Sequence, residues 1–243
     1  MFLRKDKKQN PRFENIIRRA DELLENKNLD GLKDLIKLCL RPIQSNHLLS
    51  AYIEDDHKGV ESLLWRDSLG FLAPISIKLN NTTITKTFHE WCWSEHCFID
   101  NEQATPSLSL TTDIVLPTPW EPSRIIRNLG SIGENRKQGK FIQEPNHSVI
   151  YQYPLMIGWV TGGNHSIMQG ILTGGYIKPD ELHDISILLD EVSYNGKNWI
   201  ENNKGKAIGQ PLYEEFGYCW EIAKKIALLE TSPYKTYLSQ RKE

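Results

Sequence analysis

The chain has 243 residues, with 29 Lys and Arg against 31 Asp and Glu, so its formal net charge is −2. Hydrophobic residues make up 39% and charged residues 25%, which is ordinary for a folded globular protein. This composition excludes a chain that is disordered throughout, a collagen-like chain and a generally basic nucleic-acid coat, and the length allows one large domain or two small ones.

The first residues predict two helices. Asn10-Pro11 is a helix-start signal, and apolar residues follow at helical spacing from Phe13 to Leu24. A second helix is predicted over residues 32–39, ending before Pro42, because proline disfavours helical backbone at the residue before it.

A weaker helix and a hairpin follow. The weaker helical candidate contains Val60, Leu63 and Leu64. Alternation over residues 75–79 predicts a strand, and Asn80-Asn81 predicts a two-residue hairpin turn into the next strand.

Residues 100–112 are polar and contain proline, which predicts a boundary. We therefore expect a mostly helical N-terminal region over residues 1–105 and a mixed α+β core with a C-terminal helix over residues 106–243.

The second half begins with a predicted strand and a predicted helix. Residues 113–116 form the strand, and prolines then make a rigid connection. The helix is predicted over residues 124–136, with four apolar side chains turned inward: Ile125, Ile126, Leu129 and Ile132.

Further elements are predicted along the remaining chain. Residues 148–152 and 155–160 read as strands, and residues 167–172 as a short helix. Asn195-Gly196 predicts a hairpin, and residues 211–230 predict an amphipathic C-terminal helix.

The stretch from Pro145 to Ile177 contains no Asp, Glu, Lys or Arg, and it includes the segment Gly162-Gly163-Asn164-His165-Ser166 between a strand and a helix. Glycines let the backbone turn tightly and approach a ligand closely, and the free N–H groups of the following helical turn favour an anion. We expect Asn164 and Ser166 to cap the helix and His165 to act as a donor or proton carrier.

Two more groups complete this hypothesis. His147, which precedes a strand, forms a candidate pair with His165. Arg124 and Arg127 are the candidate charge clamp for phosphate. For each of these, a purely structural role is the alternative.

The order of these motifs resembles the ParB/sulfiredoxin superfamily. The matching pieces are DIVLPTPWEPSRIIRNLGSIG, residues 113–133, and WVTGGNHSIMQGI, residues 159–171. The resemblance covers residues 113–172 and implies a ParB/sulfiredoxin-like mixed core that holds phosphate at the glycine turn. It implies a nucleoside triphosphate with Mg²⁺ as the cofactor, and a phosphotransferase or nuclease-like enzyme as the activities to consider. In the kinase branch of the superfamily an acidic residue in this neighbourhood looks like the general base, which implies that role for Glu121, with a purely structural role at the helix start as the alternative.

Two departures from the superfamily pattern matter. Asn164 stands where sulfiredoxins carry their catalytic cysteine, so the reductase chemistry should be absent. Ser166 stands where ParB-like members carry arginine, which removes a bidentate phosphate ligand. The alternative is therefore a non-catalytic binding or scaffold protein with a protein partner, and DNA is not favoured as a partner because of the net charge.

One His/Cys cluster remains, made of His89, Cys92, His96 and Cys97, and it matches no standard metal motif. The interleaved tryptophans favour packing, so no metal site is predicted. The four scattered cysteines and the lack of a secretory signal or membrane span predict a cytoplasmic protein with no membrane partner.

Overall fold

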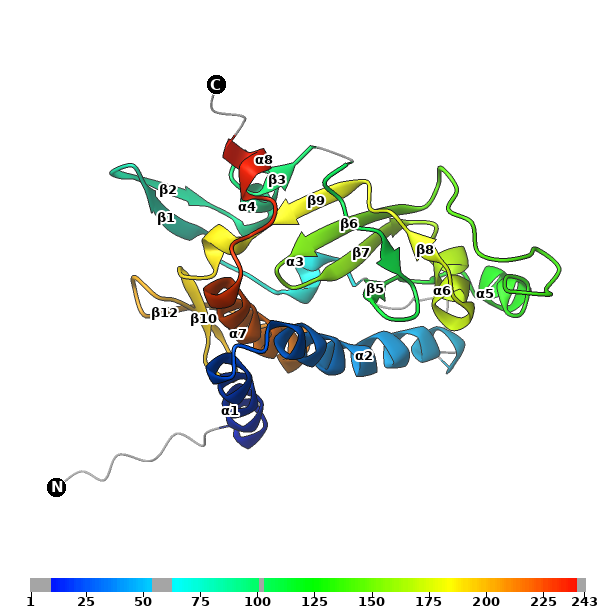
Figure 1. Cartoon of the computed structure of the whole chain (residues 1–243), viewed down its shortest axis with the longest axis horizontal. Coiled ribbons are helices and arrows are strands. Elements are labelled where there is room, and N and C mark those ends of the chain that lie inside the picture. The colour runs from blue at the N-terminus through cyan, green and yellow to red at the C-terminus, as the bar shows by residue number, and fades with distance from the viewer. Residues whose placement is uncertain (1–9, 54–62, 101–102, 240–243) are drawn as a thin grey trace.

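A computed structural model describes residues 10–53, 63–100 and 103–239 (Figure 1). The helices are α1 (Pro11–Glu25), α2 (Leu29–Ile53), α3 (Trp65–Ser68), α4 (Phe88–Cys92), α5 (Pro122–Asn128), α6 (Asn164–Thr173), the 3₁₀ helix η1 (Ser186–Leu188), α7 (Glu214–Leu229) and α8 (Lys235–Ser239). The strands are β1 (Ile75–Leu79), β2 (Thr82–Lys86), β3 (Phe98–Ile99), β4 (Leu108–Ser109), β5 (Ile114–Leu116), β6 (Ser148–Tyr153), β7 (Ile157–Gly162), β8 (Tyr176–Ile177), β9 (Glu181–Asp184), β10 (Val192–Tyr194), β11 (Trp199–Glu201) and β12 (Lys206–Gly209). The predicted α+β class, with a helical N-terminal region and a C-terminal helix, is confirmed.

The central sheet has the strand order β3-β9-β6-β7-β5. Strands β6 and β7 form an antiparallel hairpin, whereas β7 with β5 and β6 with β9 run parallel. In Figure 1 the long helix α2 runs along one side of this sheet, next to α7. The strands predicted over residues 148–152 and 155–160 are thereby confirmed as the middle of the sheet.

Strands β5, β6 and β7 are buried on both faces of the sheet, which explains why none of the three carries a charged side chain. On β5, Ile114 and Leu116 pack in one core cluster with α2 and α7, while Val115 between them packs in the other. On β7, Trp159 and Val160 divide between the two clusters in the same way. Successive strand side chains point to opposite faces, so a sheet covered on both sides needs apolar residues at nearly every position.

The predicted end of the second helix is wrong. Helix α2 continues through Pro42 to Ile53. Proline lacks the N–H that would bond to the carbonyl four residues earlier, which belongs to Leu38. Pro42 and Leu38 are both exposed, so this unpaired carbonyl lies on the solvent side of the helix. The first predicted helix is confirmed as α1, and the side chain of Asn10 accepts from two N–H groups of its first turn.

Both predicted hairpins are present. Asn80 and Asn81 adopt φ values of 46° and 65° in the turn between β1 and β2. Asn195-Gly196 lies in the loop between β10 and β11, which pair antiparallel. The weak helix candidate is only partly covered, because Val60 lies outside the described residues, and α3 begins after Leu64.

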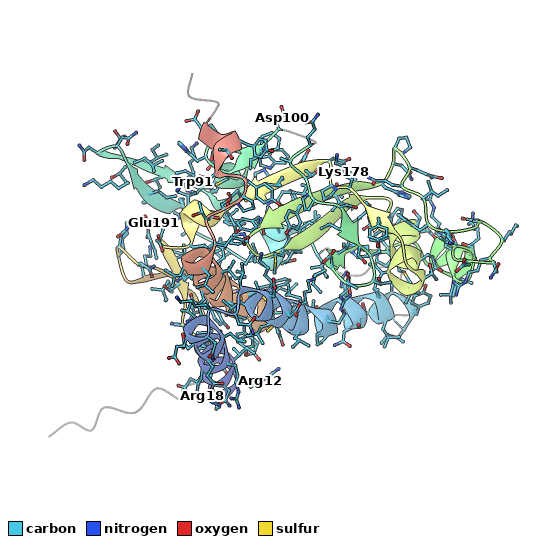
Figure 2. All side chains as sticks on the ribbon, in the orientation of Figure 1. Arg12, Arg18, Trp91, Asp100, Lys178 and Glu191 are labelled. Atoms are coloured by element: carbon cyan, nitrogen blue, oxygen red, sulfur yellow. The ribbon has the colours of Figure 1, made fainter. Side chains whose placement is uncertain are left out.

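The polar segment at residues 100–112 is not a plain linker. Within it, Leu108 lies on β4, which pairs with β8, and the side chains of Leu108 and Leu110 are buried. The division at residue 105 stays a prediction. One core cluster combines side chains from both sides of that position, including Trp91 of α4 and Trp220 of α7, and Figure 2 shows Trp91 on the ribbon.

The C-terminal amphipathic helix is confirmed as α7, which begins at Glu214 and not at the predicted Pro211. Among the residues that the structure describes, no helix combines the length and the apolar character needed to cross a bilayer.

Candidate functional site

The candidate site lies at one edge of the central sheet. Because β5 and β7 are parallel neighbours, their carboxyl ends meet at the same edge. The loop after β5 leads into α5, and the chain after β7 turns at the glycines into α6. In an open sheet, such an edge is where ligands commonly bind.

Two side chains of α6 hold the loop that follows β5. Asn164 Oδ1 accepts a hydrogen bond from the backbone N–H of Thr118 at 2.6 Å, and His165 Nε2 accepts one from the N–H of Glu121 at 3.2 Å. The beginning of α5 is therefore fastened to the N-terminal turn of α6, which places the predicted arginine helix beside the glycine turn.

The predicted caps of α6 are wrong. Gly163 is the N-cap residue, with φ 73° in the left-handed region, and no side chain caps the helix. Asn164 already lies in the first turn and uses its side chain on Thr118. Ser166 Oγ donates back to the Gly163 carbonyl at 3.1 Å. Glycine occupies the N-cap position because it adopts a left-handed conformation without strain.

The first turn of α6 therefore presents unbonded backbone donors. The first intrahelical bond at this end is from the N–H of Ile167 to the Gly163 carbonyl. No hydrogen bond within the described residues engages the backbone N–H of Asn164, His165 or Ser166. The partial positive charges of these N–H groups form the positive end of the helix dipole, which favours an anion at this position.

His147 supports the turn from below. Its side chain is buried, Nδ1 accepts from the N–H of Glu144 at 2.9 Å, and Nε2 lies 2.6 Å from Ser166 Oγ. Because Nδ1 accepts, Nε2 carries the proton and donates to Ser166. Both ring nitrogens are engaged inside the fold, so the predicted ligand contact from His147 is replaced by a role in holding Ser166.

His165 is half-buried and points its acceptor nitrogen at the loop. Since Nε2 accepts from Glu121, the neutral ring carries its proton on Nδ1, which is the free donor. Burial lowers the pKa of His165, and the positive charge of Arg124 lowers it further, while Glu121 acts in the opposite direction. His165 and Arg124 are thus close enough to interact electrostatically, as the hypothesis of a shared site requires.

Helix α5 is shorter than predicted and exposes two of its apolar side chains. It ends at Asn128, and Gly130 then reverses the chain with φ 80°. Ile126 and Leu129 are exposed and not turned inward. The predicted helix to residue 136 is wrong because the glycines at 130 and 133 take backbone conformations that are incompatible with a helix.

The charged side chains of this region differ in their engagement. Arg124 and Arg127 are exposed on α5, and among the described residues neither guanidinium has a hydrogen bond or ion pair. The Glu121 carboxylate accepts from the hydroxyl of Ser123 at 2.8 Å, at the beginning of α5. Arg124 therefore lies near the donor-rich end of α6, and no contact places Arg127 there, while the candidate base is already hydrogen-bonded.

The His/Cys cluster separates in the structure. His89 stacks against Trp65, whereas Cys92 and Cys97 are buried in the core and His96 lies beside Glu95. Across the described parts of the chain, no three His, Cys, Asp or Glu side chains gather as a metal site.

One feature was absent from the sequence hypotheses. A cavity of about 530 Å³ is lined by Asp184, Ser186, Ser232 and Lys235, among others. Its walls come from the turn after α4, the helix η1, the end of α7 and α8, which are far apart in the chain, so no local pattern marks it. The only local signal is Asp184 two residues before Ser186, a spacing typical of an Asx turn.

Comparison with known proteins gives one match. A model described as a family of unknown function (DUF6710) matches residues 1–232. No curated protein and no solved structure matches the chain.

Proposed function

The chain belongs to the DUF6710 family, a family of unknown function, and we propose that it binds a phosphate-containing ligand, with a nucleotide as the first candidate, at the N-terminal end of α6. The observation that carries this proposal is the convergence of unbonded donors at one helix end. The backbone N–H groups of residues 164–166 are the primary phosphate contacts, as at other helix N-termini that bind anions.

The side chains around this helix end also favour an anion. Nδ1 of His165 is a proton donor when the ring is neutral, and the guanidinium of Arg124 interacts electrostatically with that ring. The lack of side chains at Gly162 and Gly163 lets the turn pack closely against Asn146 and His147, which holds the N–H groups of α6 in place. The hydroxyl proton of Ser166 is directed to the Gly163 carbonyl, so Ser166 contributes its backbone N–H alone.

The order of elements supports the likeness to the ParB/sulfiredoxin superfamily as part of this proposal. Strand β5, the proline-containing loop, α5, strand β7, the glycine turn and α6 follow one another as that likeness requires, and the two strands are parallel neighbours. A nucleoside triphosphate would bring Mg²⁺ on its own phosphates, because the described residues offer no carboxylate set for the metal.

One of the two candidate acid–base groups is engaged inside the fold. His165 Nε2 accepts from the backbone N–H of Glu121, so this nitrogen is not free to remove a proton from a substrate. Glu121 accepts from Ser123 through Oε1, and a carboxylate has further lone pairs, so a phosphotransferase or nuclease activity with Glu121 as the base stays a prediction. The non-catalytic alternative is compatible with the same site.

The proposal is tested by calorimetric titration of the whole chain with ATP, with and without Mg²⁺, and with inorganic phosphate. We expect saturable binding of ATP that weakens as the salt concentration rises, because exposed charges are screened. Lack of binding by any nucleoside triphosphate or by phosphate would overturn the proposal.

A further inference from the structure

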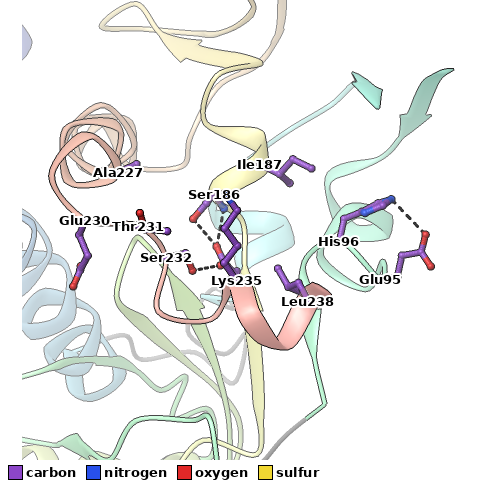
Figure 3. Close-up of a pocket in the computed structure, with 11 residues that line it drawn as sticks. Glu95, His96, Ser186, Ile187, Ala227, Glu230, Thr231, Ser232, Lys235 and Leu238 are labelled. Atoms are coloured by element: carbon purple, nitrogen blue, oxygen red, sulfur yellow. Dashed lines mark hydrogen bonds and ion pairs between the residues drawn. The ribbon is translucent and has the colours of Figure 1, made fainter. Parts of the chain in front are cut away.

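A second site lies away from α5 and α6. The cavity of about 530 Å³ opens between the turn after α4, the helix η1, the end of α7 and α8, as Figure 3 shows. In Figure 1 these elements lie well apart from the glycine turn. The volume lies within the range typical of small-molecule pockets.

The floor of the cavity is a buried carboxylate. Asp184, at the end of β9, is 2% exposed. Its Oδ1 accepts from both the backbone N–H and the hydroxyl of Ser186, at 3.0 and 2.5 Å, and its Oδ2 accepts from the hydroxyl of Ser232. Both hydroxyl protons are therefore directed at Asp184, so the two serine oxygens offer a ligand lone pairs only.

A second acceptor stands at the side of the cavity. Glu230 Oε2 accepts from Tyr153 and pairs with Lys33 at 2.9 Å, while Oε1 has no partner among the described residues. Glu95 adds a third carboxylate at the rim. Lys33 offsets the charge of Glu230, and the lining itself contains one lysine, the exposed Lys235, so Asp184 and Glu95 stand against a single ammonium group. This balance disfavours an anion such as phosphate and favours a cation.

Apolar side chains complete the wall. Ile187, Ala227 and Leu238 line the cavity beside the polar floor. A ligand that fits must combine a donor-rich positive head with a short hydrocarbon part. A primary ammonium group has three donors and no acceptor, which matches a floor made of acceptors alone.

We propose that this cavity binds a small aliphatic primary amine, with its ammonium group on Asp184, Ser186 and Ser232. The hydrocarbon part lies against Ile187 and Leu238. The same head group occurs in free alkylamines and in amino acids, and the exposed ammonium of Lys235 distinguishes them, because it would attract the carboxylate of an amino acid. This proposal is independent of phosphate binding at α6.

The test is a titration of the whole chain with n-butylamine, followed by the backbone amide signals of Ser186 and Ser232. n-Butyrate, which has a similar chain and the opposite charge, is the matched ligand control. We expect n-butylamine to shift both signals and n-butyrate to leave them unchanged. Equal binding of both compounds, or no shift by n-butylamine, would overturn the proposal.

Two variants locate the site. Asp184→Asn keeps the shape and removes the charge, and we expect binding of n-butylamine to weaken about ten- to hundred-fold. Ala227→Phe, at an exposed position of α7, fills the cavity without touching the floor and should abolish binding even if Asp184→Asn does not fold. Unchanged affinity in Ala227→Phe would contradict the proposed site.

A third variant identifies the source of the head group. Lys235→Met should weaken binding of norvaline if the ligand is an amino acid, because the partner of its carboxylate is lost. If the ligand is a free amine, n-butylamine should bind more tightly than norvaline to the unmodified chain. In either case, removal of the lysine charge should strengthen binding of n-butylamine, because a like charge beside the ammonium is lost. Loss of n-butylamine binding in Lys235→Met would contradict an ammonium group seated on Asp184.

Discussion

The ring of His147 lies directly over Gly163: a Cβ added to this glycine would stand 2.2 Å from Cδ2 of the histidine. The same ring bonds to Ser166 in the first turn of α6. The glycine turn, the first turn of α6 and the beginning of β6 are thus packed as one unit, and the geometry of the proposed phosphate site depends on it.

Replacement of Gly163 by alanine should destabilise the protein strongly. The matched control is Gly139→Ala, because Gly139 has the same φ of 73° and has no atom within 4 Å of the added Cβ. We expect a loss of about 1 kcal/mol at Gly139 from the left-handed backbone alone. At Gly163 the contact with His147 should add about 1–3 kcal/mol. Urea denaturation measures both, and equal losses would contradict the close packing.

Loss of the Arg124 charge should weaken binding of ATP. We expect Arg124→Gln to reduce the affinity about tenfold, because a charged donor beside the phosphate is lost. Arg18→Gln is the charge-matched control on α1, which Figure 2 shows far from α5. An equal effect of the two substitutions in calorimetry would indicate a general charge effect and not a site at α6.

Replacement of Pro42 by alanine should stabilise α2. The backbone is already helical on both sides of this residue, and alanine restores the N–H that the Leu38 carbonyl lacks. We expect the free energy of unfolding to rise by about 1 kcal/mol, less than the full proline penalty because proline also restricts the unfolded chain. Ser45→Ala, at a nearby exposed position, is the control for helix propensity. A destabilised Pro42→Ala variant would contradict this expectation.

The free energy of unfolding should decrease as the pH decreases, because two histidines are buried. Burial lowers the pKa of His47 to about 4 and that of His183 to about 3. In the unfolded chain both imidazoles take up a proton near pH 6.5, whereas in the folded chain they do so only at lower pH. Their contribution to stability is therefore complete above pH 6.5 and is lost as the pH falls toward 4. Each histidine contributes a slope of up to about 1.4 kcal/mol per pH unit in this window.

The variant His183→Phe isolates one of these contributions. Within the described parts of the chain neither ring nitrogen of His183 has a hydrogen-bond partner, and its neighbours include Trp65 and Trp93, so phenylalanine fits the surroundings. We expect the pH dependence of unfolding between pH 4 and 6 to become shallower in this variant. A slope equal to that of the unmodified chain would show that His183 does not stay neutral in the fold.

The sequence predicts the strands and turns whose structure follows from a local residue pattern. Short, mostly apolar runs without charge identified β6 and β7 because both faces of these strands are buried, and the Asn80-Asn81 pair identified its turn because asparagine tolerates positive φ. Prediction from local sequence was wrong where contacts between distant segments determine the role of a side chain. Asn164 could have capped α6, but its side chain bonds to Thr118 on a different segment. The link from His147 to Ser166 leaves no local signal either.

The central claim is that the first turn of α6 holds phosphate. The most direct measurement is the change in the backbone amide signals of Asn164, His165 and Ser166 while ATP is added to the isotopically labelled chain. We predict saturable shifts at these three amides, which are reduced in Arg124→Gln. If ATP saturates the protein and leaves these amides unmoved, or if it leaves the whole spectrum unchanged, the account of this site is contradicted.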